Sequence, residues 1–104
     1  MKEITVSEFK KLKDEKADFQ LIDVREEHEL EICEIGGEHI PMGDVMDNLP
    51  KISKTKQVVI HCRSGARSGA VCQSLEGQGF TNVYNLKGGI IAWANEIDPS
   101  VTKY

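Results

Sequence analysis

The residues with the clearest chemical potential in this sequence form a cysteine-containing loop at positions 62–67. Cys62 follows an apolar, β-branched run at residues 58–60. The loop holds a glycine and two arginines, Arg63 and Arg67, and a stretch of helical character follows it. A thiol in this position faces converging backbone N–H groups, the positive end of a helix dipole and two guanidinium groups. All three favour the thiolate, so we expect the pKa of Cys62 to lie below the ~8.5 of a free cysteine.

The same loop contains groups that suit an anionic substrate. Gly65 lets the backbone turn its amides inward without a side chain in the way. Arg63 and Arg67 have planar guanidinium groups whose paired N–H donors suit oxyanions. We expect one of them to point at the ligand and the other to point partly outward. If Cys62 is already ionised, no general base is required. The pattern implies no metal and no organic cofactor.

Strands that alternate with helices are predicted on both sides of this loop. The predicted strands are residues 4–6, 19–24, 58–61 and 82–86, with a turn and a short extended piece at 35–41. The predicted helices are residues 7–15 with Ser7 as N-cap, 26–31, 43–49 ended by Pro50, 66–78 and 90–96. This alternation indicates an α/β fold, a mainly parallel sheet with helices on both faces.

Three loops should share one edge of this sheet, because ligands bind at the carboxyl ends of the strands in open parallel sheets. Cys62 lies just past one such end, and Asp23 and residues 87–89 lie at two others. Asp23 and Arg25 are expected to hold this rim together within a buried charge network rather than to touch substrate. His61 should point to the opposite side of its strand and is interpreted as structural.

Composition and charge describe an ordinary soluble globular protein. The 104 residues fit one domain with one core, in which residues 98–104 are expected to form a poorly packed tail. A net charge of −4 argues against a general nucleic-acid binder. No apolar stretch approaches the ~20 residues of a membrane span and no signal-peptide pattern is evident, so a cytoplasmic protein is expected. The acidic run at residues 26–34 is interpreted as a solvated helix face, with contact to a basic partner as the alternative.

The three cysteines are Cys33, Cys62 and Cys72. An odd number, with no C-x-x-C pair and no paired histidine spacing, argues against a disulfide framework and a structural zinc site. Cys72 lies in a predicted helix and is expected to act as a small buried hydrophobic residue. Cys33 receives the same interpretation, and a role as the resolving cysteine for Cys62 remains the alternative.

Several segments resemble those of the rhodanese-like sulfurtransferase domain, in the same order and over nearly the full chain. They are Leu21-Ile22-Asp23-Val24-Arg25, His39-Ile40-Pro41, residues 59–68, residues 79–86 and Lys87-Gly88-Gly89-Ile90-Ile91-Ala92-Trp93. The resemblance implies a three-layer fold and makes Cys62 the sulfur-carrying nucleophile, which cycles between thiol and persulfide. It also implies that the outer sulfur and a small anionic donor are held by Arg63, Ser64, Gly65, Ala66, Arg67 and Ser68.

The activity implied by this resemblance is transfer of a sulfane sulfur from a donor such as thiosulfate to a thiol or cyanide acceptor. One segment departs from many rhodanese-like domains, since Met42-Gly43-Asp44-Val45 stands where they have Gly-Ala and a short apolar strand. With Gly36-Gly37 before it, this variant looks like the rhodanese domain fused to enzymes that adenylate ubiquitin-like sulfur carriers. A protein acceptor, such as a sulfur-carrier protein, is therefore expected. Because Met1 lies just before the first predicted strand, we expect no adenylating domain in this chain.

Two other functions remain open from the sequence. Cysteine phosphatases and arsenate reductases share this architecture, but phosphatases place the arginine at C-x5-R, whereas Cys62 and Arg67 form C-x4-R. The shorter loop favours one sulfur atom over a tetrahedral phosphate, and no aspartate is evidently placed as a general acid. The second alternative is a non-enzymatic binding module on the rhodanese scaffold. Inactive relatives commonly lose the cysteine, which is intact here.

Overall fold

Five short parallel strands form the centre of the protein, in the order β1-β5-β4-β2-β3. The computed structural model describes all 104 residues. The strands are β1 (Glu3–Ile4), β2 (Phe19–Asp23), β3 (Glu38–His39), β4 (Gln57–His61) and β5 (Val83–Leu86). The helices are α1 (Val6–Asp14), α2 (Glu27–Leu30), the 3₁₀ helix η1 (Met42–Lys51), α3 (Ala66–Gly77) and α4 (Gly89–Glu96). None of these helices has the length and apolar character that crossing a membrane requires.

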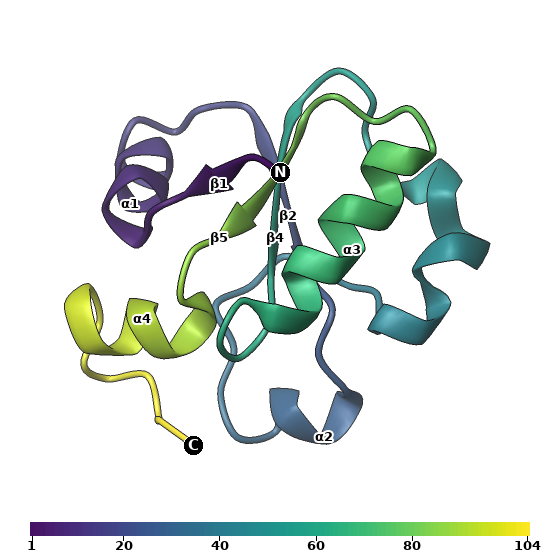
Figure 1. Cartoon of the computed structure of the whole chain (residues 1–104). Helices are drawn as coiled ribbons and strands as arrows, with labels where there is room; N and C mark the ends of the chain where they lie inside the picture. The colour runs from purple at the N-terminus through teal and green to yellow at the C-terminus, as the bar shows by residue number, and fades with distance from the viewer.

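Helices cover both faces of the sheet, as the sequence predicts. Helices α1 and α4 lie on one face, and α3 and η1 lie on the other (Figure 1). Each face of the sheet has its own apolar core, and the side chains of β4 alternate between them. Ile60 lies in the core beneath α3, and Val59 lies in the core that contains Phe9 and Trp93. Cys72 is fully buried within the α3-side core, which confirms its prediction as a small hydrophobic residue.

The N-cap of helix α1 lies two residues earlier than predicted. Thr5 is the N-cap: its hydroxyl accepts a hydrogen bond from the N–H of Glu8 at 3.1 Å, and the Glu8 carboxylate accepts one from the N–H of Thr5 at 2.9 Å. The prediction of Ser7 as the cap was wrong because this reciprocal pair satisfies two backbone donors at once. A serine cap at Ser7 would satisfy only one.

Pro50 does not end a helix, contrary to the prediction. It lies inside η1, which extends to Lys51. The segment consists of two short helices joined at Asn48, whose φ of −128° and ψ of 24° are not helical. Pro50 therefore falls in the first turn of the second piece, where a missing backbone N–H costs nothing.

The chain after α4 turns back toward α2 (Figure 1). In this segment Ser100, Thr102 and Lys103 are exposed, but Val101 packs against the α1/α4-side core and Tyr104 is partly buried. The expectation that residues 98–104 have nothing to pack against is corrected for these two side chains, because each finds a partner that is distant in sequence. Tyr104 reaches the carboxyl edge of the sheet.

Candidate active site

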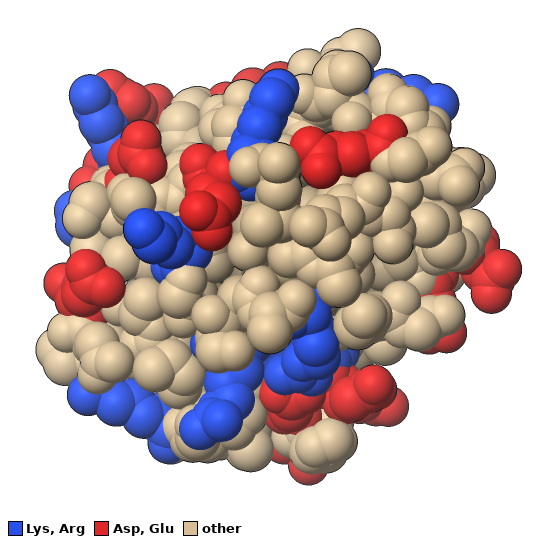
Figure 2. Space-filling model, in the orientation of Figure 1, with Lys and Arg blue, Asp and Glu red and all other residues tan.

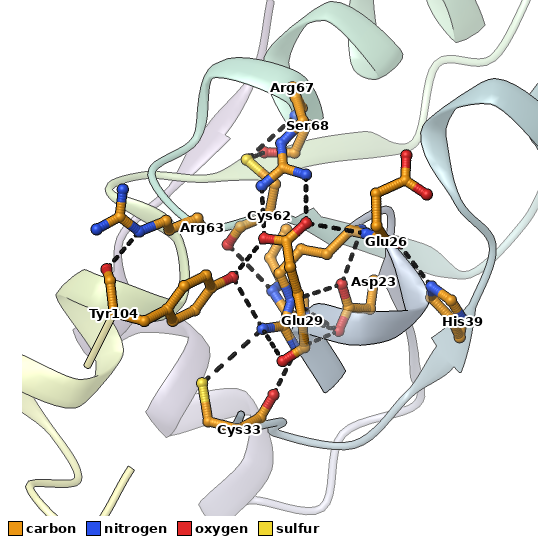
Figure 3. A network of polar contacts seen from close by, with 12 residues as sticks. Asp23, Glu26, Glu29, Cys33, His39, Cys62, Arg63, Arg67, Ser68 and Tyr104 are labelled. Carbon is orange, nitrogen blue, oxygen red and sulfur yellow. Dashed lines mark hydrogen bonds and ion pairs between the residues drawn. The ribbon is translucent and has the colours of Figure 1, made fainter. Parts of the chain in front are cut away.

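Cys62 directly follows β4 and lies at the N-terminus of the 12-residue helix α3. Its sulfur is within hydrogen-bonding distance of the N–H of Gly65 at 3.1 Å, the N–H of Ser68 at 3.4 Å and the hydroxyl of Ser68 at 3.4 Å (Figure 3). Gly65 adopts a φ of 102°, a conformation that favours glycine and that turns the loop amides toward the sulfur. The loop therefore holds its cysteine among N–H donors, as the sequence predicts.

These donors determine the ionisation of the thiol. Burial by itself would raise the pKa of Cys62, which is only 1% exposed. The hydrogen bonds from Ser68 and Gly65 outweigh this effect, so the pKa of Cys62 lies below its ordinary value. The opposite holds for Cys72, because burial without such donors raises its pKa to about 12.

An asparagine that the sequence analysis did not single out anchors the loop from β5. The Asn85 side chain donates a hydrogen bond to the carbonyl of Gly65 at 3.0 Å, and its oxygen accepts one from the Ser68 hydroxyl at 2.5 Å. Since that hydroxyl carries one proton, it can donate to Asn85 or to Cys62 but not fully to both. Asn85 thus anchors the backbone of the loop and shares the Ser68 hydroxyl with the Cys62 sulfur.

The N-terminus of α4 closes the loop from the other side. The N–H of Ile90 donates to the carbonyl of Cys62 at 3.0 Å, and the N–H of Ile91 donates to the carbonyl of Arg63 at 3.1 Å. A Cβ atom at Gly89 would lie 2.4 Å from the carbonyl oxygen of Arg63, and Gly89 has a φ of 63°. Only glycine allows this approach without displacing the cysteine loop.

A buried ion pair lies at the end of β2. The Arg25 guanidinium is fully buried and donates to the Asp23 carboxylate at 3.0 and 2.8 Å, and to the carbonyl of Cys33 at 2.8 Å. His61 is also buried, with a ring nitrogen 3.5 Å from Asp23. Burial lowers the pKa of His61, which favours the neutral ring. Asp23 and Arg25 thus form the charge pair expected at the rim.

Arg67 is held by a glutamate from the short helix α2. Its guanidinium donates to both carboxylate oxygens of Glu29, at 2.6 and 2.9 Å. This pairing lowers the pKa of Glu29 well below its usual range, since the Arg67 hydrogen bonds outweigh the cost of burial. Glu29 is only 6% exposed, so the interpretation of the acidic run as a solvated face was wrong for this residue. The other glutamates of the run are exposed, namely Glu26, Glu27, Glu31 and Glu34.

Tyr104 connects this ion pair to the rest of the rim. Its hydroxyl donates to Glu29 at 2.6 Å and accepts a hydrogen bond from Arg25 at 3.0 Å (Figure 3). The main-chain carbonyl of Tyr104 accepts a hydrogen bond from Arg63, whose guanidinium lies 5.0 Å from the centre of the Tyr104 ring. Both arginines of the cysteine loop therefore have partners within the protein.

Replacing Tyr104 by phenylalanine is expected to lower the free energy of unfolding by about 1–2 kcal/mol, because the change removes a hydroxyl that donates to a buried carboxylate. The ring and the main-chain carbonyl remain. The matched control is Tyr84→Phe, the other tyrosine of the chain, whose hydroxyl makes no hydrogen bond within the protein. Urea denaturation of both variants measures the difference; equal losses would show that the Tyr104 hydroxyl adds nothing.

Iodoacetamide is expected to alkylate Cys62 rapidly even at a pH at which a free cysteine is already protonated and reacts slowly. The reason is the depressed pKa of Cys62: below that pKa the thiol is protonated and unreactive. Ser68→Ala removes one donor to the sulfur and should move the midpoint of the pH profile upward. Peptide mapping by mass separates Cys62 from Cys72, which should stay unmodified throughout. A Ser68→Ala profile identical to wild type would contradict this explanation.

No three side chains of His, Cys, Asp or Glu lie close enough together to hold a metal ion. The fold and the site together define an α/β protein that holds a buried cysteine, among N–H donors, at the carboxyl end of its central strand. A model of the rhodanese-like domain family matches residues 5–96. The chain therefore belongs to the rhodanese-like family.

Individual relatives agree with this assignment. The chain is 40% identical over 100 residues to the Bacillus subtilis protein named putative sulfurtransferase YtwF, covering 95% of this chain and 96% of that protein. It is 33% identical to the maize (Zea mays) adenylyltransferase and sulfurtransferase MOCS3-1, covering 97% of this chain but 23% of that protein. The crystal structure of a rhodanese-like domain protein from Staphylococcus aureus matches with a TM-score of 0.85 at 33% identity, covering 100% of this chain and 99% of that one. These matches confirm the predicted fold class and place the chain among sulfurtransferase-like rhodanese domains.

Proposed function

We propose that this protein is a sulfurtransferase that carries a sulfane sulfur on Cys62 as a persulfide. The observation that carries the proposal is the buried Cys62 sulfur, which lies within hydrogen-bonding distance of two backbone N–H groups and the Ser68 hydroxyl. Such donors stabilise negative charge on sulfur both before and after transfer. A structural cysteine needs no such surroundings, as Cys72 illustrates.

In the first half-reaction the Cys62 thiolate attacks the outer sulfur of a donor such as thiosulfate. The sulfur–sulfur bond of the donor breaks, sulfite leaves with the electron pair, and a new sulfur–sulfur bond forms on Cys62. In the second half-reaction an acceptor thiolate, or cyanide in an assay, attacks the outer sulfur of the persulfide and restores the Cys62 thiolate. Neither step consumes an oxidant, and neither requires a general base once Cys62 is ionised.

The remaining rim residues have supporting roles in this proposal. The loop residues that would surround the outer sulfur and the donor are Arg63, Ser64, Gly65, Ala66, Arg67 and Ser68. Asp23 and Arg25 would hold the end of β2 against this loop. Because the maize relative combines adenylyltransferase and sulfurtransferase in its name, we propose a protein acceptor of the sulfur-carrier kind.

The test is a sulfur-transfer assay with two donors, thiosulfate and an alkyl persulfide such as 2-hydroxyethyl persulfide. Cyanide serves as acceptor, and the product measured is thiocyanate. An aryl phosphate is offered in parallel, because cysteine phosphatases share this architecture, although the C-x4-R loop is one residue shorter than theirs. Thiocyanate formation without phosphate release is the expected result. Phosphate release, with no thiocyanate from either donor, would overturn the proposal in favour of the phosphatase.

A further inference from the structure

We propose that Glu29 is a specificity-determining residue, which makes the site select sulfur donors of low charge over dianionic donors such as thiosulfate. This inference rests on the proposed sulfur transfer and narrows its donor class. Its basis is the pairing of Glu29 with Arg67, one of the two arginines of the cysteine loop. The protein supplies its own carboxylate where a donor oxyanion would otherwise bind.

The Glu29 carboxylate is fixed rather than free to move aside. It makes two hydrogen bonds with Arg67, accepts one from the Tyr104 hydroxyl at 2.6 Å, and accepts one from the N–H of Glu26 at 3.0 Å. The Glu29 side chain is 8% exposed and that of Arg67 is 34% exposed, so water reaches the pair from the arginine side. A donor that requires the full charge of Arg67 must therefore compete with a bound internal anion.

Two of the three guanidinium groups around the cysteine loop are paired with carboxylates. Arg25 pairs with Asp23 and Arg67 pairs with Glu29, while Arg63 donates to the main-chain oxygen of Tyr104. The exposed part of α2 adds further acidic side chains, Glu26 and Glu27. Figure 2 shows Lys and Arg side chains along the lower left and centre of this view, with Asp and Glu side chains beside them at the lower right, where Figure 1 places α2. A dianion thus gains little attraction from the two arginines that are already paired.

An alkyl persulfide suits this arrangement better than thiosulfate. It carries at most one negative charge, on the sulfur that enters the loop, whereas thiosulfate also brings a sulfonate group. The Cys62 thiolate attacks the outer sulfur of R–S–SH, the donor sulfur–sulfur bond breaks, and R–S⁻ leaves with the electron pair. The products are the Cys62 persulfide and a thiolate that takes its proton from water. Atoms and electrons balance without a further reactant.

The test compares Glu29→Gln with Glu27→Gln, an exposed glutamate on the same short helix that changes the net charge equally. Glutamine keeps the size of Glu29 and can still accept hydrogen bonds, but it leaves the charge of Arg67 uncompensated. We expect the KM for thiosulfate to fall about tenfold in Glu29→Gln. The KM for 2-hydroxyethyl persulfide should change less than twofold. The control Glu27→Gln should leave the KM values for both donors unchanged. If Glu29 had a purely structural role, Glu29→Gln would instead lower the kcat measured with both donors.

A second pair of variants tests the same point if Glu29→Gln does not fold. Arg67→Gln should raise the KM for thiosulfate about tenfold, because Glu29 is then unpaired and repels the dianion. The double variant Glu29→Gln/Arg67→Gln should return that KM to within about threefold of wild type. A double variant whose KM for thiosulfate is as high as that of Arg67→Gln alone would overturn the proposal. Arg67 would then bind the donor directly, and Glu29 would have no role in donor choice.

Failure of this inference is distinguishable from failure of the proposed function. Loading of Cys62 by the alkyl persulfide is followed by intact mass, which does not depend on thiosulfate. If Cys62 gains sulfur and the ratio of the two KM values is the same in wild type and Glu29→Gln, only the role of Glu29 is overturned. If no donor loads Cys62 in any variant, the sulfurtransferase proposal falls and this inference falls with it.

Discussion

Replacing Cys62 by serine is expected to reduce sulfur transfer at least about 1000-fold while the fold remains intact. The serine hydroxyl stays protonated at neutral pH, and the loop N–H groups cannot lower its pKa enough to make it a comparable nucleophile. The size of the side chain barely changes, so the same N–H groups can donate to the serine oxygen. Thiocyanate formation measures the activity, and far-UV circular dichroism checks the fold.

The matched control for this substitution is Cys72→Ala. Cys72 is a second buried cysteine whose pKa is raised to about 12, so it remains a thiol at neutral pH. Its replacement should leave sulfur transfer within about twofold of wild type, since the inert thiol only fills space in the core. Activity that survives Cys62→Ser, or that disappears with Cys72→Ala in a folded protein, would contradict the assignment of Cys62 as nucleophile.

The second large effect is expected for Asp23→Asn, which should lower the free energy of unfolding by about 3–5 kcal/mol. Asp23 and Arg25 are 3% and 0% exposed, so the substitution leaves a guanidinium buried without its counter-charge. Asp18→Asn is the control, because its carboxylate is 80% exposed and its ion pair with Lys56 is screened by water. Asp18→Asn should lower the free energy of unfolding by less than about 0.5 kcal/mol. A loss below about 1 kcal/mol for Asp23→Asn would show that the buried pair does not hold the rim.

The pH dependence of stability follows from the same residue. Although burial raises the pKa of Asp23, its hydrogen bonds and ion pair with Arg25 outweigh burial, and the pKa lies below that of the unfolded chain. Its stabilising contribution is therefore complete above the unfolded pKa of about 3.9 and is lost as the pH falls toward the folded value. The unfolding free energy of Asp23→Asn should depend less steeply on pH below about pH 4 than that of wild type.

Local patterns were sufficient to predict most of the architecture. The strands β2, β4 and β5 were all predicted, β4 from its apolar, β-branched run. The helix after the cysteine loop was also predicted, and its predicted end differs by one residue from the observed end at Gly77. These elements depend on side-chain periodicity and on short-range turn chemistry, which the order of residues carries directly. The Thr5–Glu8 pair was equally local, as a threonine followed three residues later by a glutamate, and could have been recognised.

Long-range polar pairing could not be predicted in the same way. Glu29 lies 38 residues from Arg67 and 75 residues from Tyr104 along the chain, and no periodic pattern connects them. Within the acidic run only Glu29 is buried, because the first turn of α2 directs it toward the rim while its neighbours face water. One local signal existed, since Glu26 and Glu29 have the spacing of a capping pair. Asn85 carried no such signal.

The central claim is most directly tested by the intact mass of the protein after incubation with the alkyl persulfide donor. We expect a gain of one sulfur atom that maps to the Cys62 peptide, reverses on addition of cyanide and is absent from Cys62→Ser. A protein that gains no sulfur, while its Cys62 still alkylates quickly at mildly acid pH, would contradict the persulfide mechanism. A gain that persists in Cys62→Ser would contradict the choice of nucleophile.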